Sequence, residues 1–133
     1  MKHEDLAFAP LHEQARLIAR RDLSPVELTQ IYLDRIGTFD EALTAYISLT
    51  AERAMAMARA AEVAIVGGDC RGPLHGIPVA LKDLFDVAGY PTGGGNPDWP
   101  GNLVPAERHA WAVQTLLDGG ATLVGKSITD EGS

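Results

Sequence analysis

Apolar side chains recur at helical spacing in three stretches of the first half of the chain. The segment 10–21 places its apolar residues on one face and predicts an amphipathic helix. The residues Ser-Pro-Val-Glu at 24–27 have the form of a capped helix start, and the apolar stripe that follows predicts a second helix ending at Gly37. The alanine-rich segment 50–66 predicts a third helix, with a threonine at its N-cap and two glycines after its end.

The second half of the chain shows short apolar runs separated by glycine and proline, which is typical of buried strands. The runs 77–82 and 121–124 predict two such strands, and the apolar spacing of 106–117 predicts a helix between them. A strand, a crossover helix and a second strand form a βαβ unit, so these two strands should be parallel. The segment 45–49 predicts a further short strand, and the fold class is therefore α/β with helices at the N-terminal side.

The composition indicates a soluble globular protein. The 133 residues suffice for one domain, and 46% hydrophobic with 22% charged residues argues against disorder. The formal net charge of −7 repels phosphate backbones, so we expect no nucleic-acid partner. The apolar runs are shorter than the ~20 residues that span a bilayer, so we expect no membrane partner. A single cysteine, Cys70, is compatible with a reducing cytoplasm, where we place the protein.

Residues 120–127 read Gly-Ala-Thr-Leu-Val-Gly-Lys-Ser and match the phosphate-binding loop pattern GxxxxGK[ST]. Such a loop needs a strand before its first glycine and an open backbone that curls round the phosphates. Here a predicted helix precedes Gly120, and the residues that should form the open loop are strand-like. A nucleotide binder is therefore kept as a minor alternative, and we predict a structural role for Lys126 at the polar exit of the strand.

Lys82 ends the apolar run 77–82 and admits two interpretations. In the first, it extends into solvent at the end of a strand and pairs with Asp83 or Asp86. In the second, it lies in a dry pocket, where the charged form of a lysine is disfavoured and the neutral amine can accept a proton. The spacing of the residues alone favours the first interpretation.

Several blocks of the sequence resemble the amidase signature family. Residues 72–83, Gly-Pro-Leu-His-Gly-Ile-Pro-Val-Ala-Leu-Lys-Asp, resemble its GPLxGIPxxxKD block. Residues 24–36 resemble its N-terminal helical region, residues 86–92 resemble its D-x-x-G-x-x-T continuation, and residues 116–126 resemble its strand block ending in Gly-Lys. The similarity extends over 11–131. The stretch 92–99 looks closer to amidases of small amides than to the corresponding component of the glutamine-dependent tRNA amidotransferase.

The resemblance implies hydrolysis of a carboxamide by a Ser–cis-Ser–Lys triad on an α/β fold with a mixed central sheet. Lys82 matches the triad lysine, which would take a proton through a bridging serine from the nucleophilic serine. An acyl-enzyme would form, ammonia or an amine would leave, and water would complete the cycle. The implied partner is a small-molecule amide, and neither a metal nor an organic cofactor is implied.

The chain departs from the family pattern in its serines. Ser24, Ser48, Ser127 and Ser133 all lie outside the Gly/Ser-rich context in which the family carries its two triad serines. We therefore expect one incomplete amidase domain over residues 1–133, mainly helical over 1–70, with the signature strand, loop and βαβ unit over 71–133. We expect this chain alone to be inactive, and a truncated or degenerate non-catalytic product is the alternative. Unpaired sheet edges would favour homo-oligomers.

The other conspicuous residues have structural interpretations beside functional ones. His75 is expected to order its loop through a hydrogen bond. Trp99 and Trp111 could line a substrate pocket, although Trp111 falls in the predicted helix and is more typical of a core or an interface. The glycines at 93–95 would permit either a close approach of the backbone to a ligand or a flexible turn.

Overall fold

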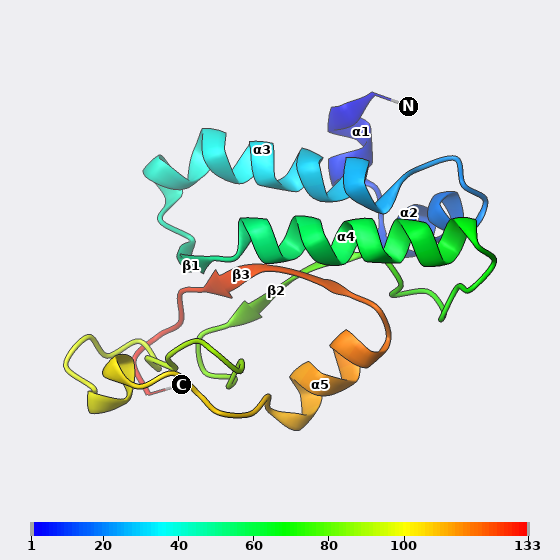
Figure 1. Cartoon of the computed structure of the whole chain (residues 1–133). Coiled ribbons are helices and arrows are strands. Elements are labelled where there is room, and N and C mark those ends of the chain that lie inside the picture. Colours follow the sequence, from blue (N-terminus) through cyan, green and yellow to red (C-terminus); the bar gives the residue numbers. More distant parts are fainter. Residues whose placement is uncertain (1, 133) are drawn as a thin grey trace.

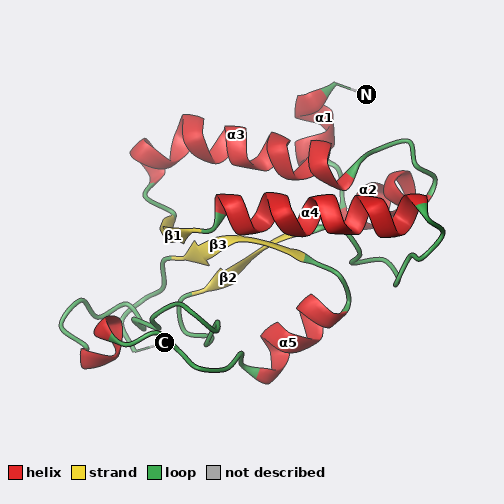
Figure 2. Cartoon of the chain, viewed as in Figure 1, coloured by secondary structure: helices red, strands yellow, loops and turns green. Residues whose placement is uncertain are grey.

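The computed structural model describes residues 2–132, which form a layer of helices on a small sheet (Figures 1 and 2). The helices are α1 (His3–Phe8), α2 (Leu11–Ala19), α3 (Pro25–Leu43), α4 (Ala51–Val66), the short 3-10 helix η1 (Pro100–Leu103) and α5 (Trp111–Asp118). The strands are β1 (Tyr46–Leu49), β2 (Pro78–Lys82) and β3 (Thr122–Ser127). In the view of Figure 1, α3 and α4 lie above the sheet and α5 lies below it.

The sheet has the order β1-β3-β2, so the last strand in the sequence is the central one. β2 and β3 are parallel and joined through α5, which confirms the predicted βαβ unit. β1 runs antiparallel to β3 and makes the sheet mixed, in agreement with the predicted fold class. Leu81 lies opposite Lys126 and Lys82 lies opposite Ser127, so the carboxyl ends of the two parallel strands are adjacent.

The core consists of two clusters of buried apolar side chains. The first joins the N-terminal helices to the residues that lead into β2, and contains Leu6, Ile18, Leu23, Leu28, Ile31, Ile65 and Ile77. The second lies between the parallel strands and α5, and contains Leu81, Val87, Val113 and Leu123. The second cluster therefore fixes the strands whose ends carry the two lysines.

The predicted start of α3 is confirmed, whereas its predicted end at Gly37 is wrong. The Ser24 hydroxyl accepts hydrogen bonds from the amides of Val26 and Glu27, and Pro25 occupies the first turn. The helix passes through Gly37 and ends at Leu43, where Thr44 adopts a left-handed conformation with φ 50°. Asp40 ends the helix, because its carbonyl accepts from the amide of Thr44 and its carboxylate accepts from the amide of Ala45 at 2.7 Å.

The third helix has the predicted bounds, but its threonine serves the sheet instead of capping. The Thr50 hydroxyl donates to the carbonyl of Leu123 at 2.5 Å, and so ties α4 to β3.

The helix expected from residue 106 begins only at Trp111. Ala106 pairs as an isolated bridge with Ala88, and its amide donates to the carbonyl of Tyr90, so this residue is extended. The helix α1 was not predicted from the sequence.

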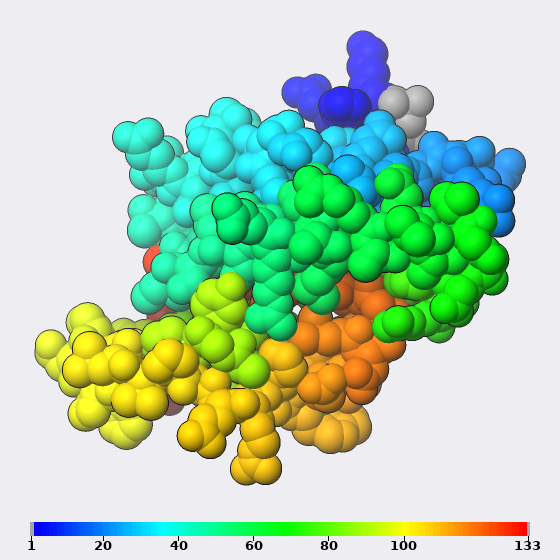
Figure 3. All heavy atoms as spheres, in the orientation of Figure 1, coloured from blue at the N-terminus to red at the C-terminus, as the bar shows by residue number. Residues whose placement is uncertain are grey.

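The phosphate-loop alternative is wrong. The backbone of 122–127 is a strand that pairs with β1 on one side and with β2 on the other, so its amides cannot form a phosphate cradle. The long connection 83–110 between β2 and α5 forms a lobe, whose yellow residues lie at the lower left of Figure 3, below the helices. Within residues 2–132, every helix is too short or too polar to cross a membrane.

Candidate active site

Lys82 lies at the carboxyl end of β2 with an exposed side chain. Side chains alternate along a strand, so Lys82 shares a face with Pro78 and Ala80, whereas Leu81 and Asp83 point to the opposite face. Pro78 and Ala80 line a groove of about 420 Å³ between the sheet and the second half of α3. Among the described residues, no acidic side chain forms an ion pair with Lys82. The amine is therefore accessible, as the first interpretation predicts, and within residues 2–132 it does not lie in the dry pocket of the second.

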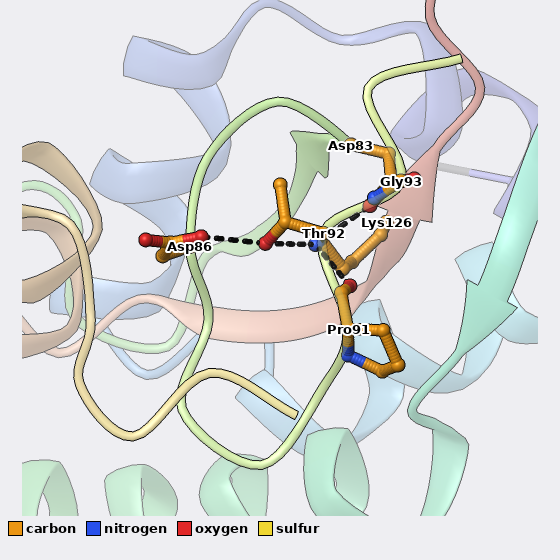
Figure 4. Close-up of polar contacts among 6 residues, drawn as sticks. All are labelled: Asp83, Asp86, Pro91, Thr92, Gly93 and Lys126. Carbon is orange, nitrogen blue, oxygen red and sulfur yellow. Dashed lines mark hydrogen bonds and ion pairs between the residues drawn. The ribbon is translucent and has the colours of Figure 1, made fainter. Parts of the chain in front are cut away.

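The acidic residue next to Lys82 pairs instead with the other lysine of the sheet. The Lys126 side chain is completely buried, and its Nζ lies 2.6 Å from Oδ1 of Asp83, which is also buried. The same Nζ donates to the carbonyl of Pro91 at 2.8 Å and to the Thr92 hydroxyl at 3.4 Å (Figure 4). The buried ammonium thus lies close to three oxygens, of which that of Asp83 forms the ion pair and that of Thr92 is the most distant.

The network continues from Lys126 into the loop that follows β2. Oδ2 of Asp83 accepts from the amide of Gly93 at 3.1 Å, and the carbonyl of Asp83 accepts from the amide of Gly94 at 2.9 Å. The Thr92 hydroxyl donates to the carboxylate of Asp86 at 2.6 Å. Asp83 therefore uses its side chain and its backbone to hold one loop against the ends of both strands.

The glycines of this loop serve close packing within the chain. A Cβ at Gly93 would lie 2.8 Å from Oδ2 of Asp83, and one at Gly95 would lie 2.6 Å from the backbone of Asp130. The amide of Gly132 donates to the carbonyl of Gly94 at 3.0 Å. Gly95 approaches the segment 129–132 of the same chain, whereas the two interpretations of residues 93–95, an approach to a ligand or a flexible turn, stay predictions.

His75 orders its loop, as predicted. Its side chain is buried, and Nδ1 accepts a hydrogen bond from the amide of Arg71 at 3.0 Å. Burial lowers the pKa of the His75 imidazole below its ordinary value, and the positive charge of Arg71 lowers this pKa further. The ring also packs on Gly120, where a Cβ would lie 2.5 Å from Cδ2 of His75. His75 therefore joins the starts of β2 and β3, at the opposite ends of these strands from Lys82.

The tryptophans lie at the surface. Trp111 opens α5 with 82% of its surface exposed, so it does not lie in the core, whereas its predicted alternative place in an interface stays a prediction. Trp99 lines an open pocket of about 400 Å³ with Asp86 and Thr92, at the outer side of the loop. Among residues 2–132, no three His, Cys, Asp or Glu side chains gather in a group that could hold a metal ion.

Sequence reasoning located Lys82 and missed the burial of Lys126. One of the two interpretations of Lys82 paired it with Asp83 or Asp86, and Lys126 was predicted to lie at a polar exit. The signal that could have found the pair is the alternation of side chains along a strand. Asp83 lies two residues after the buried Leu81 and therefore points to the same face as Leu81, and Lys126, which follows the buried run 121–125, reaches that face from β3.

The fold and this site define a mixed α/β domain that presents a free lysine at the carboxyl ends of parallel strands, which is where open α/β sheets bind ligands. The sequence of residues 27–133 matches the Amidase family. Since this match covers most of the chain, the protein belongs to the Amidase family. The resemblance inferred from the signature blocks is thereby confirmed.

The chain is similar to relatives of two kinds. It is 39% identical to the A-type subunit of the glutamyl-tRNA(Gln) amidotransferase of Acidothermus cellulolyticus, over 96% of this chain and 25% of that protein. It is 35% identical to an amidase of Pseudomonas putida, over 91% of this chain and 25% of that protein. The peptide amidase of Stenotrophomonas maltophilia has a similar structure, with a TM-score of 0.81 and 32% identity over 90% of this chain and 24% of that chain.

The chain thus spans about a quarter of the length of the relatives it matches. One of these relatives is an amidotransferase subunit and another is an amidase. The prediction that residues 92–99 favour small amides therefore stays a prediction. The family assignment applies to the chain itself, whereas the activity of the whole relatives concerns a longer polypeptide.

Proposed function

We propose that this chain supplies the proton-accepting lysine of an amidase that hydrolyses a carboxamide to an acid and ammonia or an amine. The observation that carries the proposal is Lys82, an accessible lysine without an acidic partner in residues 2–132, at the carboxyl end of β2 within the family match. A base must be reachable by the group that it deprotonates, and it must not be neutralised by a fixed carboxylate.

The proposed chemistry is that of a Ser–cis-Ser–Lys triad. The neutral amine of Lys82 accepts a proton, relayed by the bridging serine, from the nucleophilic serine. The serine oxygen bonds to the amide carbonyl carbon, the C–N bond breaks, and the amine leaves with a proton. Water then cleaves the acyl-enzyme ester. We propose that both serines belong to the part of the family's length that this chain does not span.

The second candidate is a non-catalytic amidase-like chain, and the positions of the serines in residues 2–132 favour it for the chain alone. The Ser24 hydroxyl caps α3 and contacts the carboxylate of Glu62. Ser48 and Ser127 lie within strands of the sheet. A lone base cannot form an acyl-enzyme, because the nucleophile is missing.

The test combines the chain and its reading frame. A panel of primary amides is incubated with the chain, and released ammonia is measured; we expect none above the buffer. If the coding frame continues into a Gly/Ser-rich stretch, the longer protein is made with Lys82→Ala and, as a matched control, Lys2→Ala. The first variant should lose acyl-enzyme formation by at least about a thousandfold, as mass spectrometry would detect, and the second should retain it. Normal turnover in Lys82→Ala would refute the assignment.

Three further statements remain proposals. We propose that residues 1–133 form one incomplete domain, that the protein works in the cytoplasm, and that it can form homo-oligomers. The last is supported by β2, an edge strand that pairs with β3 alone. Size-exclusion chromatography with light scattering would distinguish a monomer from an oligomer.

A further inference from the structure

We propose that Asp83 and Lys126 form a buried lock that positions Lys82, by fixing the loop 91–94 and by withholding the nearest carboxylate in sequence from the Lys82 amine. Lys126 is then a positioning residue, and its role rests on the function proposed for Lys82. The contacts that define the lock are drawn in Figure 4.

The first step of the argument is the competition between two lysines for one carboxylate. Asp83 follows Lys82 directly, yet its Oδ1 lies 2.6 Å from the Nζ of Lys126, because alternation places Asp83 on the opposite face from Lys82. The pair is out of contact with solvent, so the attraction is weakly screened. Asp83 is thereby unavailable to Lys82 in the folded chain.

The second step is the geometry that the pair imposes on the backbone. The amide of Asp83 donates to the carbonyl of Ser127, its carbonyl accepts from Gly94, and its carboxylate accepts from Gly93. Lys126 holds the carbonyl of Pro91 from the other side. The backbone just after Lys82 is thus bound on several sides, which limits the positions that the lysine can take.

The third step separates the contribution of Thr92 from those of Asp83 and Pro91. Its hydroxyl lies 3.4 Å from the Nζ of Lys126, a weaker contact than that of Asp83 or Pro91, and it donates a 2.6 Å hydrogen bond to Asp86. Thr92→Val should therefore leave the ion pair between Asp83 and Lys126 intact, and it provides a matched control within the same network.

The experiment uses the folded chain and needs no catalysis. The lysines of the chain are Lys2, Lys82 and Lys126, so acetylation by acetic anhydride can be followed at each by mass spectrometry. Hydrogen exchange at Gly93 and Gly94 reports on the loop, and exchange at Thr122, whose amide donates to the carbonyl of Ile77, reports on the sheet. The variants are Lys126→Met, the double variant Lys126→Met/Asp83→Asn, and Thr92→Val.

In the unsubstituted chain we expect Lys82 to be acetylated about as fast as Lys2 and Lys126 to be protected. In Lys126→Met, Gly93 and Gly94 should exchange at least about fivefold faster while Thr122 is unchanged. Lys82 should then be acetylated several-fold more slowly than Lys2, because the loosened backbone after β2 no longer fixes the face on which Asp83 lies, and the released carboxylate can turn to the Lys82 ammonium. The double variant should keep the fast loop exchange and restore the Lys82 rate, which a merely structural role would not predict.

The proposal is overturned if Lys126 is acetylated in the folded chain as fast as Lys2, or if Gly93 and Gly94 keep their exchange rates without Lys126. If Lys126→Met does not fold, the double variant and Thr92→Val decide, because the double variant buries no unpaired charge; unchanged loop exchange in it refutes the lock. A chain that shows all expected rates but whose longer form has no amidase activity would refute the proposed function alone.

Discussion

Strands β2 and β3 lie side by side, run in the same direction and carry a lysine near their carboxyl ends, yet they differ in their position in the sheet and in the burial of that lysine. β3 is the central strand, and residues 121–126 are buried without interruption. β2 is an edge strand, and Lys82 extends from it into solvent. In this sheet, the lysine of the central strand is buried in an ion pair, whereas the lysine of the edge strand is exposed.

The largest expected effect is the removal of the buried ammonium. Lys126→Met leaves the carboxylate of Asp83 buried without a cation, and breaking such a pair costs about 3–5 kcal/mol. Chemical denaturation followed by circular dichroism would measure the loss. The double variant with Asp83→Asn should recover most of it, because both charges are then absent. A loss below about 1 kcal/mol in the single variant would show that the pair does not stabilise the fold.

The next effect concerns the start of β3. Gly120 has φ 89°, and an added Cβ would lie 2.5 Å from the ring of His75. Gly120→Ala should therefore destabilise the chain by about 2 kcal/mol, through backbone strain and overlap together. Gly37→Ala is the matched control, because Gly37 lies within α3 and a Cβ there meets nothing within 4 Å. It should stabilise the chain by up to about 1 kcal/mol; equal effects of both substitutions in thermal unfolding would contradict the packing of His75 on Gly120.

A smaller effect is expected at the start of β2 when the pH falls. Burial and Arg71 lower the pKa of His75, so the unfolded chain binds a proton there more readily than the folded one. The free energy of unfolding should therefore decrease as the pH falls below about 6.5. Above this pH the contribution of His75 to stability is complete. The accompanying loss of the hydrogen bond from Arg71 is worth about 1 kcal/mol.

The control for this pH dependence is His75→Gln, whose amide oxygen can accept the same hydrogen bond without titrating. Urea denaturation at pH 7.5 and pH 5.5 should show a smaller decrease in this variant than in the unsubstituted chain. Equal decreases would mean that other groups cause the dependence.

The smallest effect is expected at Lys82. Lys82→Met removes an exposed amine without an ion pair in residues 2–132, so the stability should change by less than about 0.5 kcal/mol. The same denaturation curves give the comparison with Lys126→Met. If the two substitutions were equally damaging, the contrast between the strands would be false.

Local signals predicted much of this fold. Ser24 and Pro25 predicted the start of α3, and the apolar runs predicted β2, β3 and their parallel pairing. These features could be predicted because helix caps and buried strands depend on residues that are adjacent in sequence. The same reasoning failed where distant contacts decide. Gly37 did not end α3, since Asp40 ends it further on, and Ala106 is extended because it pairs with Ala88.

The candidate site divides in the same way. Lys82 was found from its position at the end of an apolar run and from the signature block around it. The burial of Lys126 was missed, because its partner Asp83 is distant in sequence and reaches it only when β2 lies beside β3. An ion pair between two strands is a property of their register, which no single run of residues specifies.

The central place of β3 has a consequence for the order in which the protein can fold during synthesis. Chains are made from the N-terminus, so the helices α1 to α4 leave the ribosome before β2, and β1 leaves between α3 and α4. β1 and β2 do not pair with each other, and each pairs with β3, which comes last. In the nascent chain β1 and β2 therefore remain unpaired, and the face of the helices that packs on the sheet stays uncovered, until residue 127 has been made. Translation that pauses before this point would leave those apolar surfaces open to chaperones, until β3 pairs with both β1 and β2.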